Sequence, residues 1–546
     1  MMGAGKSTVG AELASRLGRR FVDLDRWIEA RAGASVTAMF DAGRVTEFRA
    51  LEEAGIVELG SEAAVIATGG GAVMASSSLN HMLAHGLVVY LRARVESLLQ
   101  RLGAESIAQR PLLQKGDAAL TLRTLLDERA ASYEHAHAVI DTDARTLREV
   151  VSLVERALGP VADHRVVPVP VPESEGGAYD AFIVRDDSRG DVLRAESQRL
   201  FADRPRFLLA DRDVAARYAH RVRAALGGCP VITVQPGEAA KTLAEVERVA
   251  GELVALGIDR SAVLFALGGG ALGDLAGFVA ATMLRGVDYV HLPTTLMAMV
   301  DSSIGGKTAV NLPAGKNLIG AFHQPKLVLS DLSTLSTLAA RDRTAGLGEV
   351  LKHALLVGES QVAAIEAHAD ALRQGPVESL FDVVCAAVAY KAHVVAADPR
   401  ERKRALSREE HATGRITLNL GHTIAHGLET ASHQTNDPLR HGEAVLLGLH
   451  AEAIIGARLG YWPAGPARLS ALMPRLGLHT DLHRCLSRLA PPGVGATANV
   501  FLNALQADKK REGGRLRFVL LEAGPGHVRE VLLDARRAME ILASEK

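Results

Sequence analysis

Three short segments in the second half of the chain carry residues of the types that bind divalent metals. Glu349 lies in the segment GLGEVLK, His422 in NLGHTIAH, and His441 at the start of HGEAV. Two imidazoles and one carboxylate leave positions open on a zinc ion, which is typical of a catalytic rather than a closed structural site. A single histidine in a chain that has 20 of them is more often a packed or surface residue. The interpretation as one metal site therefore depends on the segments upstream.

A glycine-rich turn lies upstream of these segments. The apolar run 262–267 is typical of a β-strand, GGGALGD follows at 268–274, and a helix-compatible segment comes next. The order strand, glycine turn and helix directs backbone N–H groups at a diphosphate. Glycine is needed there because a Cβ atom would block the close approach. Tight turns use the same residues, so the cluster alone predicts a nucleotide site only weakly.

Polar loops follow this turn closely, and two of the three carry a lysine. They are PTT at 293–295, VDSSIGGK at 300–307 and GKN at 315–317. Lysines gathered in one short region suit an anionic substrate far better than a packing role, since charge-assisted hydrogen bonds to carboxylate and phosphate are strong.

On the basis of these sequence segments, residues from about 180 to 530 resemble 3-dehydroquinate synthase, the second enzyme of the shikimate pathway. The resemblance implies an α/β nucleotide-binding part followed by a helical part that carries the metal. It also implies NAD and a divalent metal, Zn2+ or Co2+, as cofactors. The implied reaction is cyclisation of 3-deoxy-arabino-heptulosonate 7-phosphate to 3-dehydroquinate plus phosphate.

The resemblance assigns roles residue by residue. The metal ligands are Glu349, His422 and His441. The NAD contacts are Glu238, Lys241, Gly269, Gly270, Gly273, Asp274, Thr294, Thr295 and Thr337. The catalytic residues are Arg285, Asp301, Lys307, Lys352, Asn419 and His426. Further substrate-binding residues are Lys316, Asn317, Lys391 and Arg415, with Lys509 or Lys510 closing over the phosphate.

These residue types fit the chemistry that the resemblance implies. NAD takes a hydride from one carbon of the future ring and returns it later, so no net oxidation occurs. The metal polarises the hydroxyl that is oxidised. The new ketone acidifies the adjacent C–H bond, and phosphate leaves. Lysines and arginine hold the charged groups in a dry, preorganised site.

One segment departs from the family pattern. Pro399 stands where the family usually has glutamate, and the charged stretch 398–414 is about ten residues longer than usual, in the range of a surface-loop insertion. We interpret it as a tolerated, solvated loop rather than a new binding site.

The N-terminus carries a second, independent signal. GAGKST at 3–8 matches the second half of a P-loop, in which lysine reaches the phosphates and serine coordinates Mg2+. DLD at 23–25, EFR at 47–49, GGG at 69–71, RPLL at 110–113 and Arg129 follow. Each alone has an ordinary structural explanation, but the ordered series resembles shikimate kinase over residues 1 to about 158.

This second resemblance implies ATP-dependent 3-phosphorylation of shikimate, with ATP and Mg2+ as cofactors. The ATP contacts are Gly3, Gly5, Lys6, Ser7, Thr8 and Arg110, of which Ser7 also binds the magnesium ion and Arg110 belongs to a mobile lid. The shikimate contacts are Asp25, Arg49, Gly70, Gly71 and Arg129, and Asp25 orients or deprotonates the accepting hydroxyl.

The start of the chain departs from the kinase pattern. A P-loop follows a buried β-strand, whereas this sequence opens at Met1-Met2-Gly3 without that strand or the motif's first glycine. We expect the true start to lie upstream, because every downstream kinase motif is intact. As numbered, the chain is expected to phosphorylate shikimate poorly, since a frayed loop positions the phosphates badly. The alternative is a non-catalytic kinase half that stabilises or regulates the synthase.

Composition agrees with a fusion of enzyme domains. A chain of 546 residues is too long for one core. A net charge of −1 gives no nucleic-acid signature, and no apolar run is expected to cross a membrane. Three scattered cysteines fit a reducing cytoplasm. We expect small-molecule substrates as partners, and a homodimer through the synthase half is left open.

The expected fold class is α/β in three parts. A P-loop kinase-type parallel sheet domain, apparently without its first strand, spans 1–158, and an extended linker rich in valine and proline spans 159–178. A nucleotide-binding α/β domain spans 179–341 and a helical metal- and substrate-binding domain spans 342–546. Rival functions are another sugar-phosphate cyclase or a metal-dependent alcohol dehydrogenase. Lys307, Lys316 and Lys352 argue against the dehydrogenase, which has no phosphate to bind.

Overall fold

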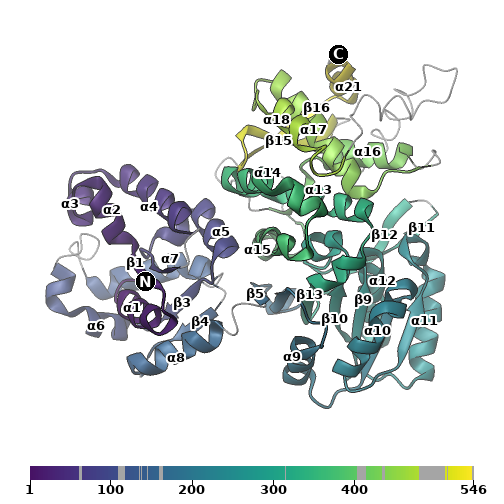
Figure 1. Ribbon diagram of the computed structural model, residues 1–546, viewed down its shortest axis with the longest axis horizontal. Helices are drawn as coiled ribbons and strands as arrows, with labels where there is room; N and C mark the ends of the chain where they lie inside the picture. Colours follow the sequence, from purple (N-terminus) through teal and green to yellow (C-terminus); the bar gives the residue numbers. More distant parts are fainter. Residues whose placement is uncertain are drawn as a thin grey trace. The chain divides into compact units, whose positions relative to one another are not determined.

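The computed structural model divides the chain into two compact units, Met1–Ala162 and Asp163–Lys546 (Figure 1). It describes residues 1–60, 64–108, 117–133, 136, 138–143, 145–158, 164–313, 315–402, 414–432, 437–478, 511–512 and 515–543.

The first unit alternates helices with short parallel strands. Its elements are α1 (Lys6–Leu17), β1 (Arg20–Asp23), α2 (Leu24–Ala32), α3 (Val36–Asp41), α4 (Val45–Gly60), β2 (Ala64–Ala67), η1 (Ala72–Met74), α5 (Ser76–His85), β3 (Val89–Arg92), α6 (Val95–Ala108), α7 (Ala118–Tyr133), β4 (Ala138–Asp141) and α8 (Leu147–Leu158). In α8 the buried residues Val150, Val151 and Val154 recur at helical spacing and face the core. This helix therefore packs one apolar face on the core of the unit.

Among the described residues, the strands of the first unit form two separate parallel pairs, β1 with β2 and β3 with β4. Each strand is followed along the chain by a helix, which is the connection that parallel strands require. The expected P-loop-type parallel architecture is confirmed, with no strand joining the two pairs in the part of the unit that is described.

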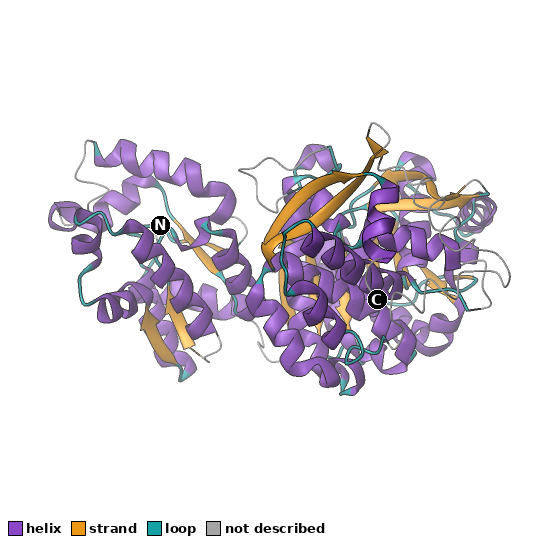
Figure 2. Ribbon diagram, turned by 90° about the horizontal axis from the view of Figure 1, so that it is seen from above, coloured by secondary structure: helices purple, strands orange, loops and turns teal. Residues whose placement is uncertain are grey.

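A seven-stranded sheet forms the first part of the second unit (Figures 1 and 2). The strand order is β5-β6-β13-β10-β9-β7-β8, and only the pair β5-β6 is antiparallel. These strands are β5 (His164–Val169), β6 (Tyr179–Val184), β7 (Arg206–Asp211), β8 (Val231–Val234), β9 (Val263–Gly268), β10 (Asp288–Pro293) and β13 (Leu327–Asp331). The strand expected over 262–267 is therefore present as β9.

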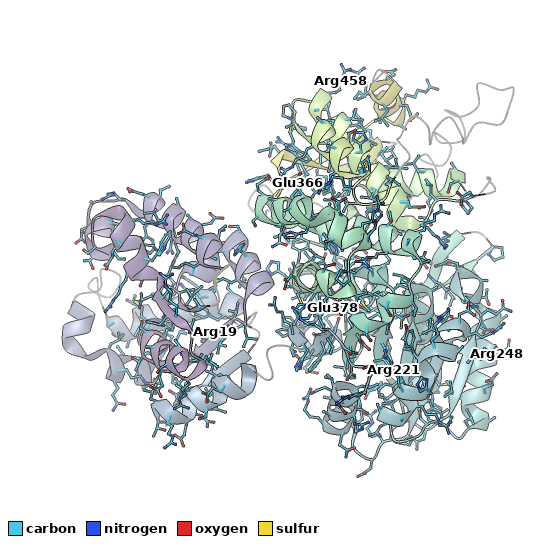
Figure 3. All side chains as sticks on the ribbon, in the orientation of Figure 1. Arg19, Arg221, Arg248, Glu366, Glu378 and Arg458 are labelled. Atoms are coloured by element: carbon cyan, nitrogen blue, oxygen red, sulfur yellow. The ribbon has the colours of Figure 1, made fainter. Side chains whose placement is uncertain are left out.

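Helices cover both faces of this sheet. Leu264 and Ala266 of β9 pack with α11 (Leu243–Ala255) and α12 (Gly270–Thr282). The alternate residues Phe265 and Leu267 pack with α9 (Asp191–Phe201) and α10 (Arg212–Ala225). Because successive side chains of a strand point to opposite faces, a continuous apolar run is what a doubly covered parallel strand needs. Arg248 on α11 and Arg221 on α10 are labelled in Figure 3.

The prediction of an extended linker over 159–178 is wrong for residues 164–169. These residues form β5, which pairs with β6 along its whole length. The valine-proline alternation implies an extended backbone but does not tell a free linker from a strand. Pro168, opposite Asp180, cannot donate to a ladder, and an edge strand such as β5 tolerates this.

Helices dominate the second part of this unit. They are α13 (Ala340–Val357), α14 (Glu359–Gln374), η7 (Val377–Leu380), α15 (Phe381–Ala397), η8 (Arg415–Asn419), α16 (His422–Ser432), α17 (His441–Arg458), α18 (Gly465–Leu472) and α21 (Ala535–Ala543). A small antiparallel sheet, with strands β14 (Arg511–Glu512), β15 (Arg515–Gly524) and β16 (His527–Leu533), was not predicted. Its signal was two short apolar segments, 516–521 and 528–533, separated by the turn residues Gly524-Pro525-Gly526.

One stretch among the described residues, Val377–Ala397, is long and apolar enough to cross a membrane, although the sequence analysis expected none. Of its most apolar window, 72% is buried inside the protein. Such burial is that of a core helix, and α15 occupies this position between the sheet and the other helices (Figure 1).

Candidate active sites

The glycine turn between β9 and α12 brings backbone very close to neighbouring side chains. A Cβ atom at Gly270 would lie 2.7 Å from Ser302 Oγ, and one at Gly269 would lie 3.2 Å from Thr295 Cγ2. At Gly273 it would lie 2.1 Å from the ring of His291 on β10. These positions therefore require glycine so that the first turn of α12 can approach the end of β10.

A buried lysine ties three elements together beside this turn. Lys241 follows η3 (Gly237–Ala240) and is 2% exposed. Its Nζ lies 2.7 Å from Asp274 Oδ2 on α12 and 2.7 Å from Asn317 Oδ1 on β12 (Gly315–Phe322). Burial raises the pKa of Asp274, and Lys241 opposes that change. Glu238 Oε2 accepts from Asn311 Nδ2 at 2.8 Å on β11 (Lys307–Leu312), so Glu238 faces the same hairpin.

A second charged cluster lies between the sheet and α13. Asp301, in the π-helical turn η5 (Ala298–Ser302), accepts from Lys391 Nζ at 2.5 Å and lies 3.8 Å from Lys352 Nζ. Burial would raise the pKa of Asp301, but the two ammonium groups hold it well below its usual range. Burial lowers the pKa of Lys391 to about 8 against the opposing effect of Asp301. The cluster places two cations and one anion in a desolvated pocket.

Glu349, His422 and His441 come together as one group. Their ligand atoms lie within 4.8 Å of one another, and the Nε2 atoms of both histidines lie 3.4 Å from Glu349 Oε1. Glu349 on α13 is fully buried. His422 and His441 open α16 and α17, so three helices supply one ligand each.

The outer partners of the histidines fix their ring orientation. Nδ1 of His422 lies 3.0 Å from the Leu420 carbonyl oxygen, and Nδ1 of His441 lies 3.1 Å from Glu429 Oε2. Both acceptors require a proton on Nδ1, so Nε2 is the nitrogen of each ring that faces Glu349 and would be offered to a metal ion. Two imidazole nitrogens and a buried carboxylate therefore fit a divalent zinc-type ion.

The pKa values of Glu349, His422 and His441 indicate how strongly protons compete with a metal ion for these three side chains. Burial, with Lys352 nearby, lowers the pKa of His422 to about 3. Burial also opposes charge on His441, but Glu349 and Glu429 raise its pKa to about 10. Burial would raise the pKa of Glu349, yet Lys352 and the histidines hold it well below its usual value. A cation that binds here must displace the proton of His441.

A neighbouring group, Asp301, Glu349 and His353, has similar spacing. It is a poorer cation site than the triad, because Lys391 Nζ lies 2.5 Å from Asp301 Oδ1 and Lys352 Nζ lies 3.8 Å from the same oxygen. The ammonium groups already occupy the carboxylate oxygens and would repel a second metal ion.

The β11–β12 hairpin presents two lysines to the helical part. Lys307 Nζ contacts a carboxylate oxygen of Glu401, and Lys316 Nζ lies 2.7 Å from Glu429 Oε1. Both lysines are half exposed, so they border the site rather than line its interior. The hairpin thus joins the nucleotide turn to the metal-type triad.

The η8–α16 segment adds further expected site residues. Arg415 is 3% exposed and donates from Nη2 to the Gly305 carbonyl oxygen at 2.6 Å, while burial lowers its pKa. Asn419 ends η8. The ring of His426 lies 5.6 Å from that of His422 and 6.5 Å from that of His441, one turn along α16.

Arg285 and Thr337 do not join these clusters. Arg285 lies on η4 (Met283–Arg285), at the opposite end of α12 from the glycine turn and about 20 Å along the helix axis. Thr337 ends η6 (Leu332–Thr337), where its Oγ1 lies 2.6 Å from the Tyr218 hydroxyl. Arg110, Lys509 and Lys510 lie outside the described residues.

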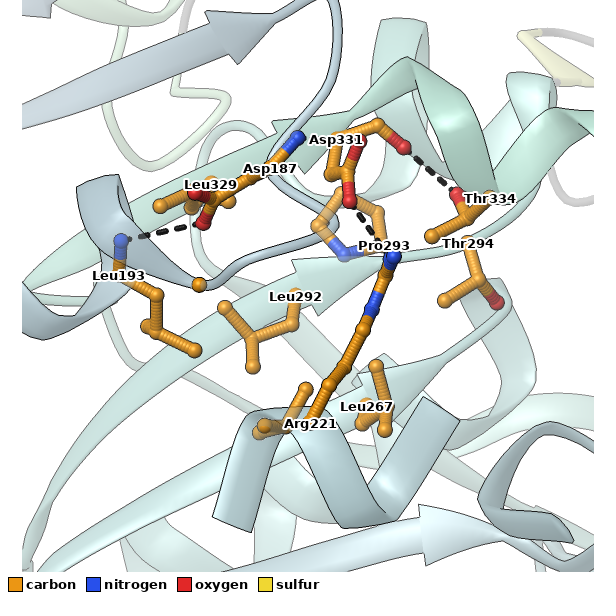
Figure 4. Close-up of a pocket in the computed structure, with 12 residues that line it drawn as sticks. Asp187, Leu193, Arg221, Leu267, Leu292, Pro293, Thr294, Leu329, Asp331 and Thr334 are labelled. Carbon is orange, nitrogen blue, oxygen red and sulfur yellow. Dashed lines mark hydrogen bonds and ion pairs between the residues drawn. The ribbon is translucent and has the colours of Figure 1, made fainter. Parts of the chain in front are cut away.

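Figure 4 shows a small cavity at the carboxyl ends of β9, β10 and β13. Its volume of about 30 Å³ suits a water molecule rather than a ligand. Arg221 Nη2 donates to Asp331 Oδ2 at 2.6 Å across it, and Asp331 Oδ1 accepts from the Asp187 and Ser333 amides. This network anchors the start of η6 to α10.

The first unit carries a separate site in a cavity of about 480 Å³, a volume suited to small molecules. Its floor is the turn before α1, where Gly3 and Gly5 have φ values of 73° and 86°. Backbone amides at this helix start form an anion site. Lys6, Ser7 and Thr8 line the cavity, and Ser7 donates to Asp23 Oδ2 at 2.6 Å.

The residues expected to hold shikimate gather around Gly69 to Gly71, and Asp25 and Gly70 among them line this cavity. Gly70 lies at its edge, and its carbonyl oxygen accepts from Arg129 at 3.1 Å and from Tyr133 at 2.6 Å. A Cβ atom at Gly71 would lie 2.7 Å from the guanidinium of Arg49. A Cβ atom at Gly69 would lie 3.2 Å from Asp25 Oδ1. The structure therefore brings Asp25, Arg49, Gly70, Gly71 and Arg129 together.

Sequence reasoning missed several carboxylates at these sites. Glu52 is buried one turn after Arg49 and contacts it. Glu429 is seven residues after His422, and this spacing repeats a helical face after two turns. Glu401 lies in the charged stretch that was interpreted as a surface loop, yet it contacts Lys307. Helical spacing could have found the first two.

Both units of the chain match known protein families. Family models match as shikimate kinase over residues 2–158, 3-dehydroquinate synthase N-terminal over 231–345, and 3-dehydroquinate synthase C-terminal over 346–511. Among solved structures, 2-epi-5-epi-valiolone synthase from Streptomyces hygroscopicus subsp. jinggangensis 5008, with NAD+ and Zn2+ bound, is 26% identical with a TM-score of 0.55. The match covers 67% of this chain and 96% of that one. A 2-deoxy-scyllo-inosose synthase, complexed with carbaglucose-6-phosphate, NAD+ and Co2+, is 24% identical with a TM-score of 0.56 over the same shares and shares the fold.

The fold and sites thus define a P-loop kinase domain joined to a two-part cyclase-type synthase. The 3-dehydroquinate synthase of Halorhodospira halophila is 42% identical over 328 residues, which are 60% of this chain and 86% of the relative. That of Xanthomonas axonopodis pv. citri is 42% identical over 366 residues, 64% of this chain and 93% of the relative. The chain belongs to the 3-dehydroquinate synthase family and carries a shikimate kinase domain at its N-terminal side, so it is a bifunctional enzyme of the shikimate pathway.

Proposed function

We propose that the second unit converts 3-deoxy-arabino-heptulosonate 7-phosphate to 3-dehydroquinate and phosphate with bound NAD and one divalent metal ion. The observation that carries this proposal is the continuous row of groups from the glycine turn to the triad. Lys241 and Asp274 lie beside the turn, Asp301 and Lys391 lie between the sheet and α13, and Glu349 begins the triad. A cofactor, an anionic substrate and a metal ion would meet along this row.

Glu349, His422 and His441 would hold the metal ion, and zinc suits the two imidazoles and one carboxylate. Bound there, the ion supplies Lewis-acid polarisation of a substrate hydroxyl. The relatives of known structure with NAD+ and Zn2+ or Co2+ support this choice of cofactors.

The NAD diphosphate would lie on the turn of Gly269 and Gly270 at the start of α12, where backbone amides point outward. Glu238 and Lys241 would face the adenosine side, and Thr294 and Thr295 would lie beneath the dinucleotide at the end of β10. When bound, NAD supplies a hydride acceptor that can return the same hydride within one turnover.

The substrate's carboxylate and phosphate would be held by the buried or bordering cations. Lys352, Lys391 and Arg415 are at most 8% exposed, so their charge acts at low effective dielectric constant. Lys316 and Lys307 would close the pocket from the hairpin, and Glu401 adds a carboxylate at its rim. Asn317, Asn419 and His426 would orient the hydroxyl groups.

The test is to supply the purified chain with the keto-acid phosphate and measure phosphate release and NADH absorbance together. Phosphate release that requires NAD, without NADH accumulation, is the expected result. Stoichiometric NADH build-up with retained phosphate would instead support a dehydrogenase, and release without NAD would refute the proposal.

For the first unit we propose transfer of the ATP γ-phosphoryl group to the 3-hydroxyl of shikimate. Lys6 would contact the phosphates, Ser7 would hold Mg2+, and Asp25 would orient the accepting hydroxyl from its place beside Gly69. Arg49 and Arg129 would hold the shikimate carboxylate and hydroxyls. Slow ATP-dependent formation of shikimate 3-phosphate by the purified chain is expected, and its absence with retained synthase activity would favour a non-catalytic module.

We further propose that the enzyme acts in the cytoplasm on small molecules, as its biosynthetic relatives imply. A homodimer through the synthase unit is part of this proposal, and sedimentation of the full chain would test it.

A further inference from the structure

A chain of three residues links the β11–β12 hairpin to the metal-type triad. Lys316 Nζ lies 2.7 Å from Glu429 Oε1, and Glu429 Oε2 lies 3.1 Å from His441 Nδ1. His441 Nε2 in turn faces Glu349 Oε1 at 3.4 Å. One carboxylate therefore uses both of its oxygens, one on a ligand of the triad and one on the hairpin.

The two histidines of the triad are held in different ways. His422 donates to the carbonyl oxygen of Leu420, two residues away in its own chain segment, and its side chain is 12% exposed. The His441 side chain is 36% exposed and depends on a side chain of another helix. Its orientation is therefore set less by local backbone and more by Glu429.

Helical spacing places Glu429 where this contact is possible. His422, His426 and Glu429 recur at intervals of four and three residues on α16, so they share one face. His441 opens the next helix, α17, which packs against α16. The Glu429 side chain is 17% exposed, so its carboxylate acts in a partly desolvated setting.

We propose that Glu429 is the positioning residue that orients His441 for the metal ion, and that Lys316 couples this orientation to the hairpin. The inference rests on the proposed metal site. A carboxylate that accepts from Nδ1–H fixes the tautomer with the Nε2 lone pair free, orients the ring and raises its basicity as a ligand. Lys316 restrains the carboxylate, so the hairpin that borders the substrate pocket also restrains a metal ligand.

The test measures zinc affinity of the full chain by competition with a chelator, and the absorption spectrum of its Co2+ form. The variants are Glu429→Ala, Glu429→Gln and Lys316→Met. The matched control is Thr430→Ala, which removes the exposed neighbouring side chain on the same helix. Glu429→Ala is expected to weaken zinc binding about 10- to 100-fold. Lys316→Met is expected to weaken it roughly 2- to 5-fold, as for one partly exposed ion pair.

Glu429→Gln keeps the volume and one acceptor, so its zinc affinity should fall between those of wild type and Glu429→Ala. The Co2+ spectrum should change in the Glu429 variants and stay unchanged in Thr430→Ala. In the Glu429→Ala background, Lys316→Met should have no further effect on zinc affinity, because the link is already broken.

Zinc affinity of Glu429→Ala within twofold of the control would overturn the inference. The inference would also be overturned if Lys316→Met lowered zinc affinity equally in the wild-type and Glu429→Ala backgrounds. Lys316 would then affect zinc binding independently of Glu429. If wild type and His441→Ala bind zinc equally, the proposed metal site itself is refuted, and that outcome is distinct from failure of the positioning role alone.

Discussion

Replacing Gly273 by alanine should disable the nucleotide side of the synthase through one methyl group. The new Cβ would lie 2.1 Å from the ring of His291, so the two groups must separate by about 1.3 Å to reach ordinary contact. His291 is 2% exposed in the middle of β10 and has little room to move. The first turn of α12 must therefore shift away from the strand.

The expected magnitudes follow from that shift. Overpacking a buried site costs about 1–3 kcal/mol of the free energy of unfolding. A displacement of about 1 Å of the Gly269–Gly270 amides is expected to lower kcat/KM of the synthase on the order of 100-fold, with weaker NAD binding. NAD titration, steady-state phosphate release and thermal unfolding of the full chain measure the three effects.

The chain offers a matched control in Gly251, a helical glycine of α11 with no heavy atom within 4 Å of an added Cβ. Gly251→Ala should raise stability by about 0.5–1 kcal/mol and leave NAD binding unchanged. Combining Gly273→Ala with His291→Ala should restore NAD affinity relative to Gly273→Ala, because the clash is removed. Wild-type NAD affinity in Gly273→Ala, or no rescue by His291→Ala, would refute the reasoning.

Three further predictions concern the metal, the buried lysine and the P-loop. Chelation should abolish phosphate release by the synthase, and added zinc or cobalt should restore it. His441→Ala should lose the bound metal ion and leave the shikimate kinase activity unchanged. Full phosphate release in a chelated, metal-free sample would contradict the prediction of a metal-dependent synthase. Because the pKa of Lys391 is lowered to about 8, kcat/KM of the synthase should fall as pH rises through that value, and Lys391→Arg should remove this limb. The same lowered pKa means the charged lysine destabilises the fold below pH 8, so the free energy of unfolding should rise from there toward the unfolded pKa of about 10.4. Lys6→Met should abolish ATP-dependent phosphorylation of shikimate and leave phosphate release by the synthase intact, and equal loss of both activities would argue against two separate sites.

The sequence was informative wherever chemistry or periodicity demands particular residues. The run 262–267 with its glycine turn predicted β9 and the start of α12, and the three ligand-type segments predicted the grouping of Glu349, His422 and His441. Resemblance to known families placed most of the remaining site residues, which the structure brings into two clusters in the synthase unit.

Other features could not be predicted because they depend on tertiary partners. Extended backbone at 164–169 was recognised, but only pairing with β6 makes it a strand. Glu401 lies in a charged stretch with the composition of a solvated loop, and its contact with Lys307 follows from the hairpin's position. Arg285 was grouped with the site from its resemblance alone, although the length of α12 separates it from the glycine turn.

Under the proposed assignment, the ion pairs of the hairpin lysines would make substrate binding an exchange of ionic partners. Lys307 and Lys316 already hold the carboxylates of Glu401 and Glu429, so an incoming phosphate or carboxylate must replace or share an anion that the protein itself provides. The substrate affinity would then reflect the difference between two interaction energies of one ammonium group, one with the substrate anion and one with the protein carboxylate. This difference favours a doubly charged phosphate over a singly charged carboxylate. The exchange would also remove the lysine partner of a protein carboxylate, and Glu429 would then keep its contact with Nδ1 of His441. Binding of the substrate at the hairpin would thus change the electrostatic environment of the metal ligand His441 before any bond in the substrate changes.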